Sequence, residues 1–382
     1  MRNYWFISFS ILFISSCTPS KKITVRSKYN ISGLKFVDEY VVPNGVEYGG
    51  TVVGGLSGID YDKAKDEYYI ICDDPSVKGP ARFYTANILL NEQGIDSVVF
   101  TGMTPVLNAV GVPYPDITKD LLHSADLESM RFDSVHQVFV RGSEGQRRIR
   151  DDAQSIQQPD IVAMDKNGRY IDSFSLPANM RLQAVEKGPR HNSVFEGLDF
   201  ADDYKSLFVS VEEALYEDAP KAGLGDSTSW VRFLKFDMTS KKQVAQYAYQ
   251  IDAIPYPANP PGAFKINGVS DILYLGDEKF IVIERAYSTG RIPTDIKIYL
   301  ADAKGAENIA EIPSLKLQPA KKPIQKKLLL DMNNTLKRDI FNVEGVTFGP
   351  TLANGRRSLV LVTDNNFNAK EKTQFLLFEV LP

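Results

Sequence analysis

The chain has 382 residues, 43% of them hydrophobic and 11% aromatic, and its 44 Lys and Arg stand against 48 Asp and Glu. This composition excludes an intrinsically disordered chain, which combines few apolar residues with a large net charge. The net charge of −4 argues against nucleic acid as a partner, because phosphate backbones are bound by basic surfaces.

The N-terminus is typical of a secretion signal. Arg2 precedes an apolar run over residues 5–14, which is shorter than the roughly 20 residues of a membrane-spanning helix. Ser15-Ser16-Cys17 follows directly, and small residues before a Cys resemble the lipobox of bacterial lipoproteins, in which that Cys is acylated. An ordinary secretory signal, with Cys17 uninvolved, is the alternative.

On the lipoprotein interpretation, residues 1–16 are a signal peptide, 17–30 a tether and 31–382 a folded body. Acyl chains on Cys17 would hold that body on a lipid bilayer, in the cell envelope and facing the periplasm or the exterior. Cys72 is then the remaining thiol, so no disulfide within the chain is expected.

After residue 50 the sequence repeats itself. Five short segments align with one another, and they are residues 56–62, 127–133, 195–200, 269–274 and 343–348. One aligned position, 68 to 74 residues from the next, is held in turn by Ser57, Glu128, Glu196, Ser270 and Glu344.

Each segment is followed by a second apolar run that ends in an acid. In the first three units this acid lies 16 positions after the aligned residue, a regularity that is hard to obtain by chance. The five acids are Asp73, Glu144, Glu212, Glu284 and Asp364.

Two further strand-like runs follow in each unit. Examples are 161–165 with 170–174, 231–237 with 244–249, and 296–300 with 309–312. Four short β-branched and aromatic runs in about 70 residues are typical of a β-propeller blade. The sequence therefore predicts an all-β fold, a single β-propeller with five blades.

The same pattern predicts how the ring closes. The run 374–380 is the third strand of the last unit, and the early strand 34–42 is expected to complete that blade. A sixth blade within residues 104–125 or 313–341 is the alternative. The basic stretch Lys321–Lys327 is expected to be a solvated loop.

In a propeller the first strand of each blade lines the central channel, so the aligned acids should converge there. Converging carboxylates need Arg or Lys partners, shared protons or a cation, and candidate internal partners are Arg131, Arg141 and Arg285. Oxygen ligands without His or Cys suit calcium, or alternatively magnesium. The expected metal ligands are Asp73, Glu128, Glu144, Glu212, Glu284 and Asp364. The alternative is structural, with the acids capping turns or pairing with Arg between blades.

Other catalytic signatures are sparse. The chain has no P-loop, dinucleotide fingerprint, EF-hand loop or zinc-protease motif, and Ser57 lacks the spacing of a nucleophile elbow. His191 precedes Glu196 by five residues and is a candidate acid or base near neutral pH, with a loop His of no role as the alternative. Asn192 and Asn342 also precede aligned glutamates and are candidate ligand-binding residues.

A family resemblance joins these motifs. Gly55-Leu56-Ser57-Gly58-Ile59, Asp126-Leu127-Glu128-Ser129, Asn192 to Leu198, Val282-Ile283-Glu284-Arg285, and Asn342 to Gly345 with Thr363 to Phe367 together resemble the phytase-like family, described as having esterase-like activity of phytase. The resemblance runs from about residue 50 to the end, and it implies a propeller and a phosphoester hydrolase assisted by calcium. Ser57 and Ser270 depart from its Glu pattern, and Ser129 stands in place of Gly.

Two functions follow as hypotheses. The first is a membrane-tethered monomer that hydrolyses a phosphorylated small molecule, with Glu196, Glu344, His191 and Arg285 as catalytic residues. Arg141, Asn192 and Asn342 would then bind the substrate. The second is a non-catalytic propeller that binds a ligand or a protein at the cell surface.

Overall fold

The computed structural model describes Met1 and residues 31–150, 154–291 and 293–382. The predicted tether, Cys17 and all of the predicted signal peptide except Met1 lie outside the described residues. In the described part of the chain, no helix is long and apolar enough to cross a membrane.

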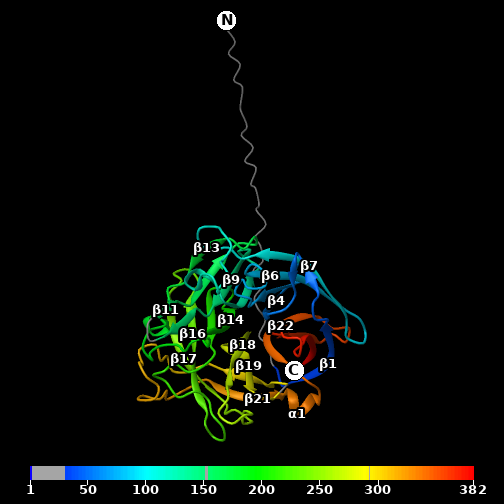
Figure 1. Cartoon of the computed structure of the whole chain (residues 1–382). Helices are drawn as coiled ribbons and strands as arrows, with labels where there is room; N and C mark the ends of the chain where they lie inside the picture. The colour runs from blue at the N-terminus through cyan, green and yellow to red at the C-terminus, as the bar shows by residue number, and fades with distance from the viewer. Residues whose placement is uncertain (2–30, 151–153, 292) are drawn as a thin grey trace.

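The described strands form five four-stranded antiparallel sheets set around a central axis (Figure 1). Blade one is β4 (Leu56–Asp62), β5 (Glu67–Cys72), β6 (Arg82–Leu90) and β7 (Ile95–Pro105). Blade two is β8 (Leu127–Asp133), β9 (Val138–Ser143), β12 (Asp160–Met164) and β13 (Tyr170–Ser173). Blade three is β14 (Phe195–Ala201), β15 (Ser206–Val211), β16 (Ser229–Asp237) and β17 (Gln243–Ile251).

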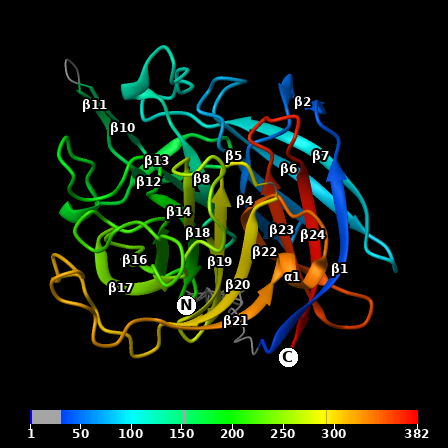
Figure 2. The same ribbon diagram turned by 60° about the horizontal axis from the view of Figure 1, so that its bottom comes forward.

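Blade four is β18 (Lys265–Gly276), β19 (Lys279–Ser288), β20 (Asp295–Asp302) and β21 (Gln325–Asp331). Blade five combines both ends of the chain: β22 (Asn342–Thr351), β23 (Arg357–Asp364), β24 (Thr373–Leu381) and β1 (Gly33–Val42). β1 pairs antiparallel with β24 from Gly33 opposite Leu381 to Val42 opposite Thr373, and Figure 2 shows the two strands side by side. The predicted closure of the last blade is confirmed.

Few other elements interrupt this plan. They are the hairpins β2 (Glu47–Tyr48) with β3 (Thr51–Val52) and β10 (Gln146–Ile149) with β11 (Gln154–Gln157), the helix α1 (Met332–Leu336), and the 3-10 turns η1 (Leu121–His123) and η2 (Ala178–Met180). The innermost strands β4, β8, β14, β18 and β22 surround the axis (Figure 1). Blades bury their faces against each other: Ile283 of β19 shares one apolar cluster with Leu361 of β23.

The prediction of five blades is confirmed, and the two segments considered for a sixth blade hold none. Residues 104–125 contain the end of β7 and η1, and residues 313–341 contain β21 and α1.

One strand prediction in blade four was wrong. Residues 309–312 are not a strand, because Ile309 and Ile312 pack instead with Ala248 and Leu315 in a separate small cluster. The true outer strand is β21, which includes part of the stretch that we expected to be a solvated loop. Within it Lys326 is partly buried, and its Nζ lies 2.7 Å from Asp252 Oδ1 and 2.5 Å from Glu284 Oε1.

Candidate active site at the propeller hub

Every inner strand carries a β-bulge at the position that the repeat singled out. The pairing of the inner strand with its neighbour breaks register at this position in all five blades, at Ser57, Glu128, Glu196, Ser270 and Glu344. A bulge inserts an extra residue that is left out of the ladder and re-aims its side chain. One repeated backbone irregularity thus sets the first ring of side chains at the hub.

The register also defines a second ring, and it corrects one assignment. The residue before each bulge pairs with a partner on the second strand, and the residue after that partner is Asp73, Glu144, Glu212, Arg285 or Asp364 in blades one to five. In blade four the partner itself is Glu284. A shift of one residue turns a strand side chain to the opposite face, so Arg285 takes the place predicted for Glu284.

Glu284 consequently lies outside the hub. Its carboxylate accepts hydrogen bonds from Tyr249 Oη at 2.8 Å, from the Asp252 amide at 2.8 Å and from Asn267 Nδ2 at 3.1 Å, and it pairs with Lys326. These contacts tie β17, β18, β19 and β21 together, so Glu284 is a structural residue of blade four.

Eight carboxylates converge at the hub. All but Asp73 are buried, with at most 8% of the residue surface exposed. Their oxygens form three groups, within each of which one oxygen per residue lies within 4.8 Å of the others: Asp73, Glu344 and Asp364; Asp126, Glu128 and Glu144; and Glu144, Glu196 and Glu212.

Arg285 bridges two of these carboxylates. Its Nη2 lies 2.6 Å from Glu212 Oε1, and its Nη1 lies 3.1 Å from Glu344 Oε1. Nη1 also donates to Asn342 Oδ1 at 2.8 Å, and Asn342 Nδ2 donates to Glu344 Oε1 at 2.8 Å. The guanidinium therefore links Glu212 of blade three to Glu344 of blade five, and the Asn342 amide supports Glu344.

Several carboxylate oxygens have no partner within the described residues. These are Oε2 of Glu144, of Glu196 and of Glu344, all buried, and Nε of Arg285 is likewise without an acceptor. A buried polar atom without a hydrogen bond costs free energy, so the cluster as it stands is under-compensated.

The protonation behaviour reflects this shortage of positive charge. Burial, reinforced by neighbouring carboxylates, raises the pKa of Asp73, Glu128, Glu144 and Glu196 well above the ordinary range. Burial also raises the pKa of Glu344 to about 8, although Arg285 opposes the shift.

The remaining three acids show smaller increases with the same leading cause. Burial raises the pKa of Asp126 and of Glu212 to about 7, and that of Asp364 to about 6. Arg285 counters the effect at Glu212 and Gln146 counters it at Asp126. A cluster with these properties can hold protons at neutral pH, or exchange them for a cation.

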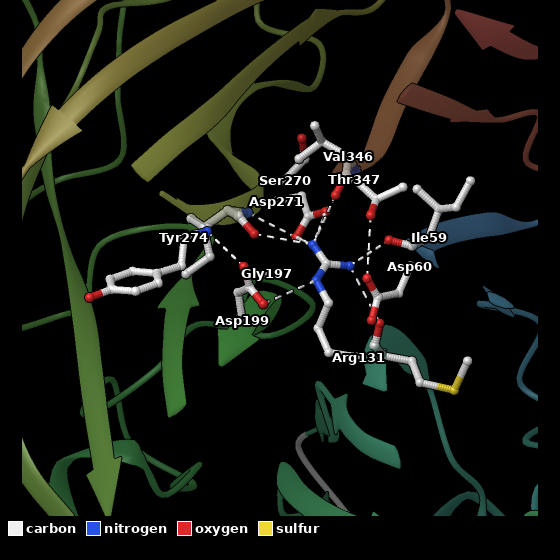
Figure 3. A network of polar contacts seen from close by, with 12 residues as sticks. Ile59, Asp60, Arg131, Gly197, Asp199, Ser270, Asp271, Tyr274, Val346 and Thr347 are labelled. Atoms are coloured by element: carbon white, nitrogen blue, oxygen red, sulfur yellow. Dashed lines mark hydrogen bonds and ion pairs between the residues drawn. The ribbon is translucent and has the colours of Figure 1, made fainter. Parts of the chain in front are cut away.

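A second polar layer on the axis has the opposite character (Figure 3). Arg131 on β8 is fully buried and reaches the other four inner strands. Its contacts are Ile59 O on β4 at 2.7 Å, Asp199 Oδ1 on β14 at 3.9 Å, Asp271 Oδ1 and Oδ2 and Ile272 O on β18 at 3.0, 2.8 and 3.1 Å, and Val346 O on β22 at 3.1 Å.

The aspartates of this layer join neighbouring blades. Asp60 accepts from the Phe132 amide at 2.8 Å, which joins blades one and two. Asp199 accepts from the Tyr274 amide at 2.7 Å, which joins blades three and four, and Asp271 accepts from the Val346 amide at 2.8 Å, which joins blades four and five. Arg131 therefore links the inner strands of all five blades and does not neutralise the eight carboxylates.

A cavity of about 360 Å³ opens beside the carboxylate cluster. Of the site residues expected from the sequence, eight line it: Asp73, Glu128, Asn192, Glu196, Glu212, Arg285, Asn342 and Glu344. Gly55 makes room for one of them, because a Cβ at this position (φ +60°) would lie 2.1 Å from Asp73 Oδ1.

Two other predicted residues lie elsewhere. Arg141 is buried against Asp160 and Tyr114, with its Nη2 2.8 Å from Tyr114 Oη, and does not line the cavity. His191 is exposed, and its Nδ1 lies 3.3 Å from the Arg147 amide. Partial burial and the nearby Arg148 and Arg147 lower its pKa.

Sequence reasoning missed Asp126 as a member of the site. Asp126 Oδ2 accepts from Gln146 Nε2 at 2.7 Å and belongs to the group with Glu128 and Glu144. The available signal was an acid two positions before the aligned Glu128, directly before the inner strand β8 begins.

Comparison with known proteins identifies a matching family. A family model described as phytase-like, esterase-like activity of phytase, matches residues 51–367. An uncharacterized secreted protein of Arthroderma benhamiae is 28% identical over 149 residues, a stretch that spans 36% of this chain and 28% of that protein.

Two solved structures match most of the chain at low identity. A GH43 β-1,3-galactosidase solved with galactodeoxynojirimycin is 10% identical with a TM-score of 0.46, and the match covers 89% of this chain and 94% of that one. The propeller of Dos1 is 9% identical with a TM-score of 0.31, over 85% and 68% of the two chains. The family match covers most of the chain, including all five bulged inner strands, and the protein therefore belongs to the phytase-like family.

Proposed function

We propose that the protein is an extracytoplasmic hydrolase of phosphate esters that uses divalent cations held at the propeller hub. The observation that carries the proposal is the convergence of eight carboxylates, with three unpartnered buried oxygens, beside an open cavity. The phytase-like family and the name of the secreted Arthroderma protein support the hydrolase activity and the extracytoplasmic location.

The donor set fits calcium or magnesium. Each of the three groups offers carboxylate oxygens alone, and hard cations prefer such ligands, whereas zinc prefers nitrogen or sulfur. Glu144 belongs to two of the groups, so it would be shared between two adjacent ions. A bound divalent cation offsets substrate charge and increases the acidity of a nearby water.

The chain's own residues supply positioning and proton transfer. Arg285 lines the cavity and has a free Nε–H, so its guanidinium is the group that would bind a phosphate oxygen. Asn342 fixes the orientation of that guanidinium through the 2.8 Å contact with Nη1.

Hydrolysis requires one proton to leave the attacking water and one to reach the leaving alcohol. Oxygen of water forms the new P–O bond while the ester P–O bond breaks. Glu344, with its pKa raised to about 8, can hold a proton at neutral pH and deliver it to the leaving oxygen. Glu196, which has an unpartnered oxygen, would accept the proton of water.

The test is hydrolysis of phosphomonoesters by the purified protein with calcium, with magnesium and with chelator. We expect turnover that needs a divalent cation and falls by at least about a hundredfold in Glu196→Gln. The matched control is Glu311→Gln, an exposed acid outside the hub, which should keep full activity. Cation binding without turnover in the wild type would favour the alternative, a non-catalytic binding propeller.

A further inference from the structure

The walls of the cavity differ from one side to the other. Blades one, two, three and five supply its acids, through Asp73, Glu128, Glu196, Glu212 and Glu344. Blade four and the loop before it supply none of these acids. They supply instead an apolar face, formed by Phe264, Ile266 and Tyr287 and continued by Phe341.

This face exists because the inner hairpin of blade four is longer than the others. β18 begins five residues before its bulge at Ser270, whereas β4, β8 and β14 begin one residue before theirs. β19 continues to Ser288, beyond Arg285, whereas β5, β9 and β15 end before the equivalent acid. The extension carries Ile266 and Tyr287 toward the mouth of the cavity.

Phe264 stands at the end of this extension in an unusual setting. The residue is 59% exposed, and the centroid of its ring lies 6.1 Å from that of Tyr287. Its backbone is nevertheless fixed, because Phe264 O accepts hydrogen bonds from the Thr289 amide at 2.9 Å and from Thr289 Oγ1 at 2.8 Å. A large apolar ring held in place at a cavity mouth is typical of a ligand contact.

The charges of the cavity limit the charge of a ligand that can bind against this apolar face. Six carboxylates line the cavity, those of Glu371 and the five acids above, against the guanidiniums of Arg285 and Arg291. Even two divalent cations would leave no excess of positive charge, because Asp126, Glu144 and Asp364 add three carboxylates to the six of the lining. Such a lining accommodates one phosphate group, whereas a polyphosphorylated ring would bring far more negative charge than the lining can offset.

We propose that the substrates are phosphomonoesters with a single phosphate and an apolar, aryl-sized alcohol portion, and that Phe264 and Tyr287 hold this portion. The proposal rests on the hydrolase function above and names its substrate class. In this arrangement the phosphate points to Arg285 at the acidic side, and the leaving group lies on the face of blade four.

Binding of two inert phosphonates tests the proposal apart from turnover. Titration calorimetry at saturating calcium would compare phenylphosphonate with methylphosphonate, which share the anion and differ in the apolar group. We expect phenylphosphonate to bind roughly tenfold tighter or more, and this ratio to fall below about threefold in Phe264→Ala. Phe264→Tyr should restore the ratio.

The matched control is Leu317→Ala, which removes an exposed apolar side chain far from the cavity lining and should leave the ratio unchanged. Initial rates provide a second measurement: kcat/KM for phenyl phosphate should exceed that for glycerol 3-phosphate and for inositol hexakisphosphate.

The outcomes separate the two proposals. If both phosphonates bind equally and Phe264→Ala changes nothing, the substrate class is wrong while the hydrolase function stands. The same holds if inositol hexakisphosphate is the best substrate. If neither phosphonate binds and no ester is hydrolysed with any cation, the proposed hydrolase function is wrong, and the proposed substrate class is wrong as well.

Discussion

The axis of the propeller holds two layers of buried charged side chains, and the charges are compensated to different extents in the two layers. In the layer around Arg131, the guanidinium donates to Asp271 and to four backbone carbonyls, and the aspartates accept amide hydrogen bonds from neighbouring blades. In the layer above, eight carboxylates gather and Arg285 contacts two of them. The first layer leaves Nε of Arg131 without a hydrogen bond, although this atom lies 3.9 Å from Asp199 Oδ1, whereas the second leaves three carboxylate oxygens and Nε of Arg285 without a partner among the described residues.

The difference indicates how the fold separates stability from chemistry. A buried charge network stabilises a structure when its partners are complete, as they are for Nη1 and Nη2 of Arg131. Incomplete partners persist at functional sites because a ligand completes them. The cavity opens at the incomplete layer, which is where a cation and a substrate have a role.

Removal of Arg131 should have the largest effect on stability. Arg131→Met leaves Asp199 and Asp271 buried without their cation, and loss of one partner of a buried pair costs about 3–5 kcal/mol. Urea denaturation should therefore show a large drop in the free energy of unfolding, or no folded protein. Arg356→Met is the control: Arg356 is exposed, and its buried partner Glu379 keeps its contacts with Lys35 and Asn354, so the value should change by about 1 kcal/mol or less. Equal effects of the two substitutions would contradict the role of Arg131.

Neutralising one acid in each layer should shift stability in opposite directions. Asp271→Asn weakens a satisfied ion pair and should cost about 3 kcal/mol. Glu196→Gln removes an under-compensated carboxylate, so it should stabilise the chelated protein by about 1 kcal/mol. With calcium present, Glu196→Gln should instead lower Tm relative to the wild type, since it removes a ligand. Destabilisation by Glu196→Gln in chelator would show that the upper layer is already satisfied.

The stability of the chelated protein should depend on pH through the upper layer. Its carboxyl groups have a raised pKa, so the folded chain binds protons more tightly than the unfolded chain. The free energy of unfolding should therefore be highest below about pH 4.5 and fall as the pH rises through about 6 to 8, the values for Asp364, Glu212 and Glu344. Calcium competes with these protons, so its effect on Tm should grow over the same range.

Thermal melts at pH 5 and pH 8, each with calcium and with chelator, would measure this dependence. Burial also raises the pKa of Asp271 in the Arg131 layer to about 7, so the same melts on Asp271→Asn show how much of the pH dependence comes from that layer. A calcium shift in Tm that is equal at pH 5 and pH 8 would contradict proton competition at the hub.

The sequence was sufficient to predict the repeat, the five blades, the closing strand and most of the acids at the hub. These features depend on period and on residue type, which are visible in one chain: Glu128, Glu196 and Glu344 recur at one position. Asp73, Glu144 and Glu212 recur 16 residues after the aligned position of their blades.

The errors arose where the side chain's direction depends on register. Glu284 and Arg285 are adjacent, and only the pairing of Glu284 with Val269 and of Arg285 with Gly268 shows which of them faces the axis. Arg131 was expected to be a partner of the hub glutamates. It lies three residues after Glu128 on β8, however, and therefore belongs to the layer of Asp199 and Asp271. The outer strand of blade four was missed because a long loop separates β20 from β21. The apolar residues of this loop, Ile309 and Ile312, pack in a cluster without forming a strand.

The smallest expected effects come from the two blades with Ser at the bulge, and they compare the layers most finely. Ser57 Oγ donates to Glu128 Oε2 at 2.9 Å, so it serves the carboxylate cluster, whereas Ser270 Oγ donates to Val343 O at 2.8 Å and joins two inner strands. Each Ser→Ala substitution removes one buried hydrogen bond and should cost about 1 kcal/mol in chelator. Calorimetric melts with calcium should then distinguish them, because Ser57→Ala alters the setting of a cation ligand and should change the calcium shift in Tm. Ser270→Ala should leave that shift unchanged, since its partner is a backbone carbonyl; equal calcium shifts in the two variants would remove Ser57 from the site.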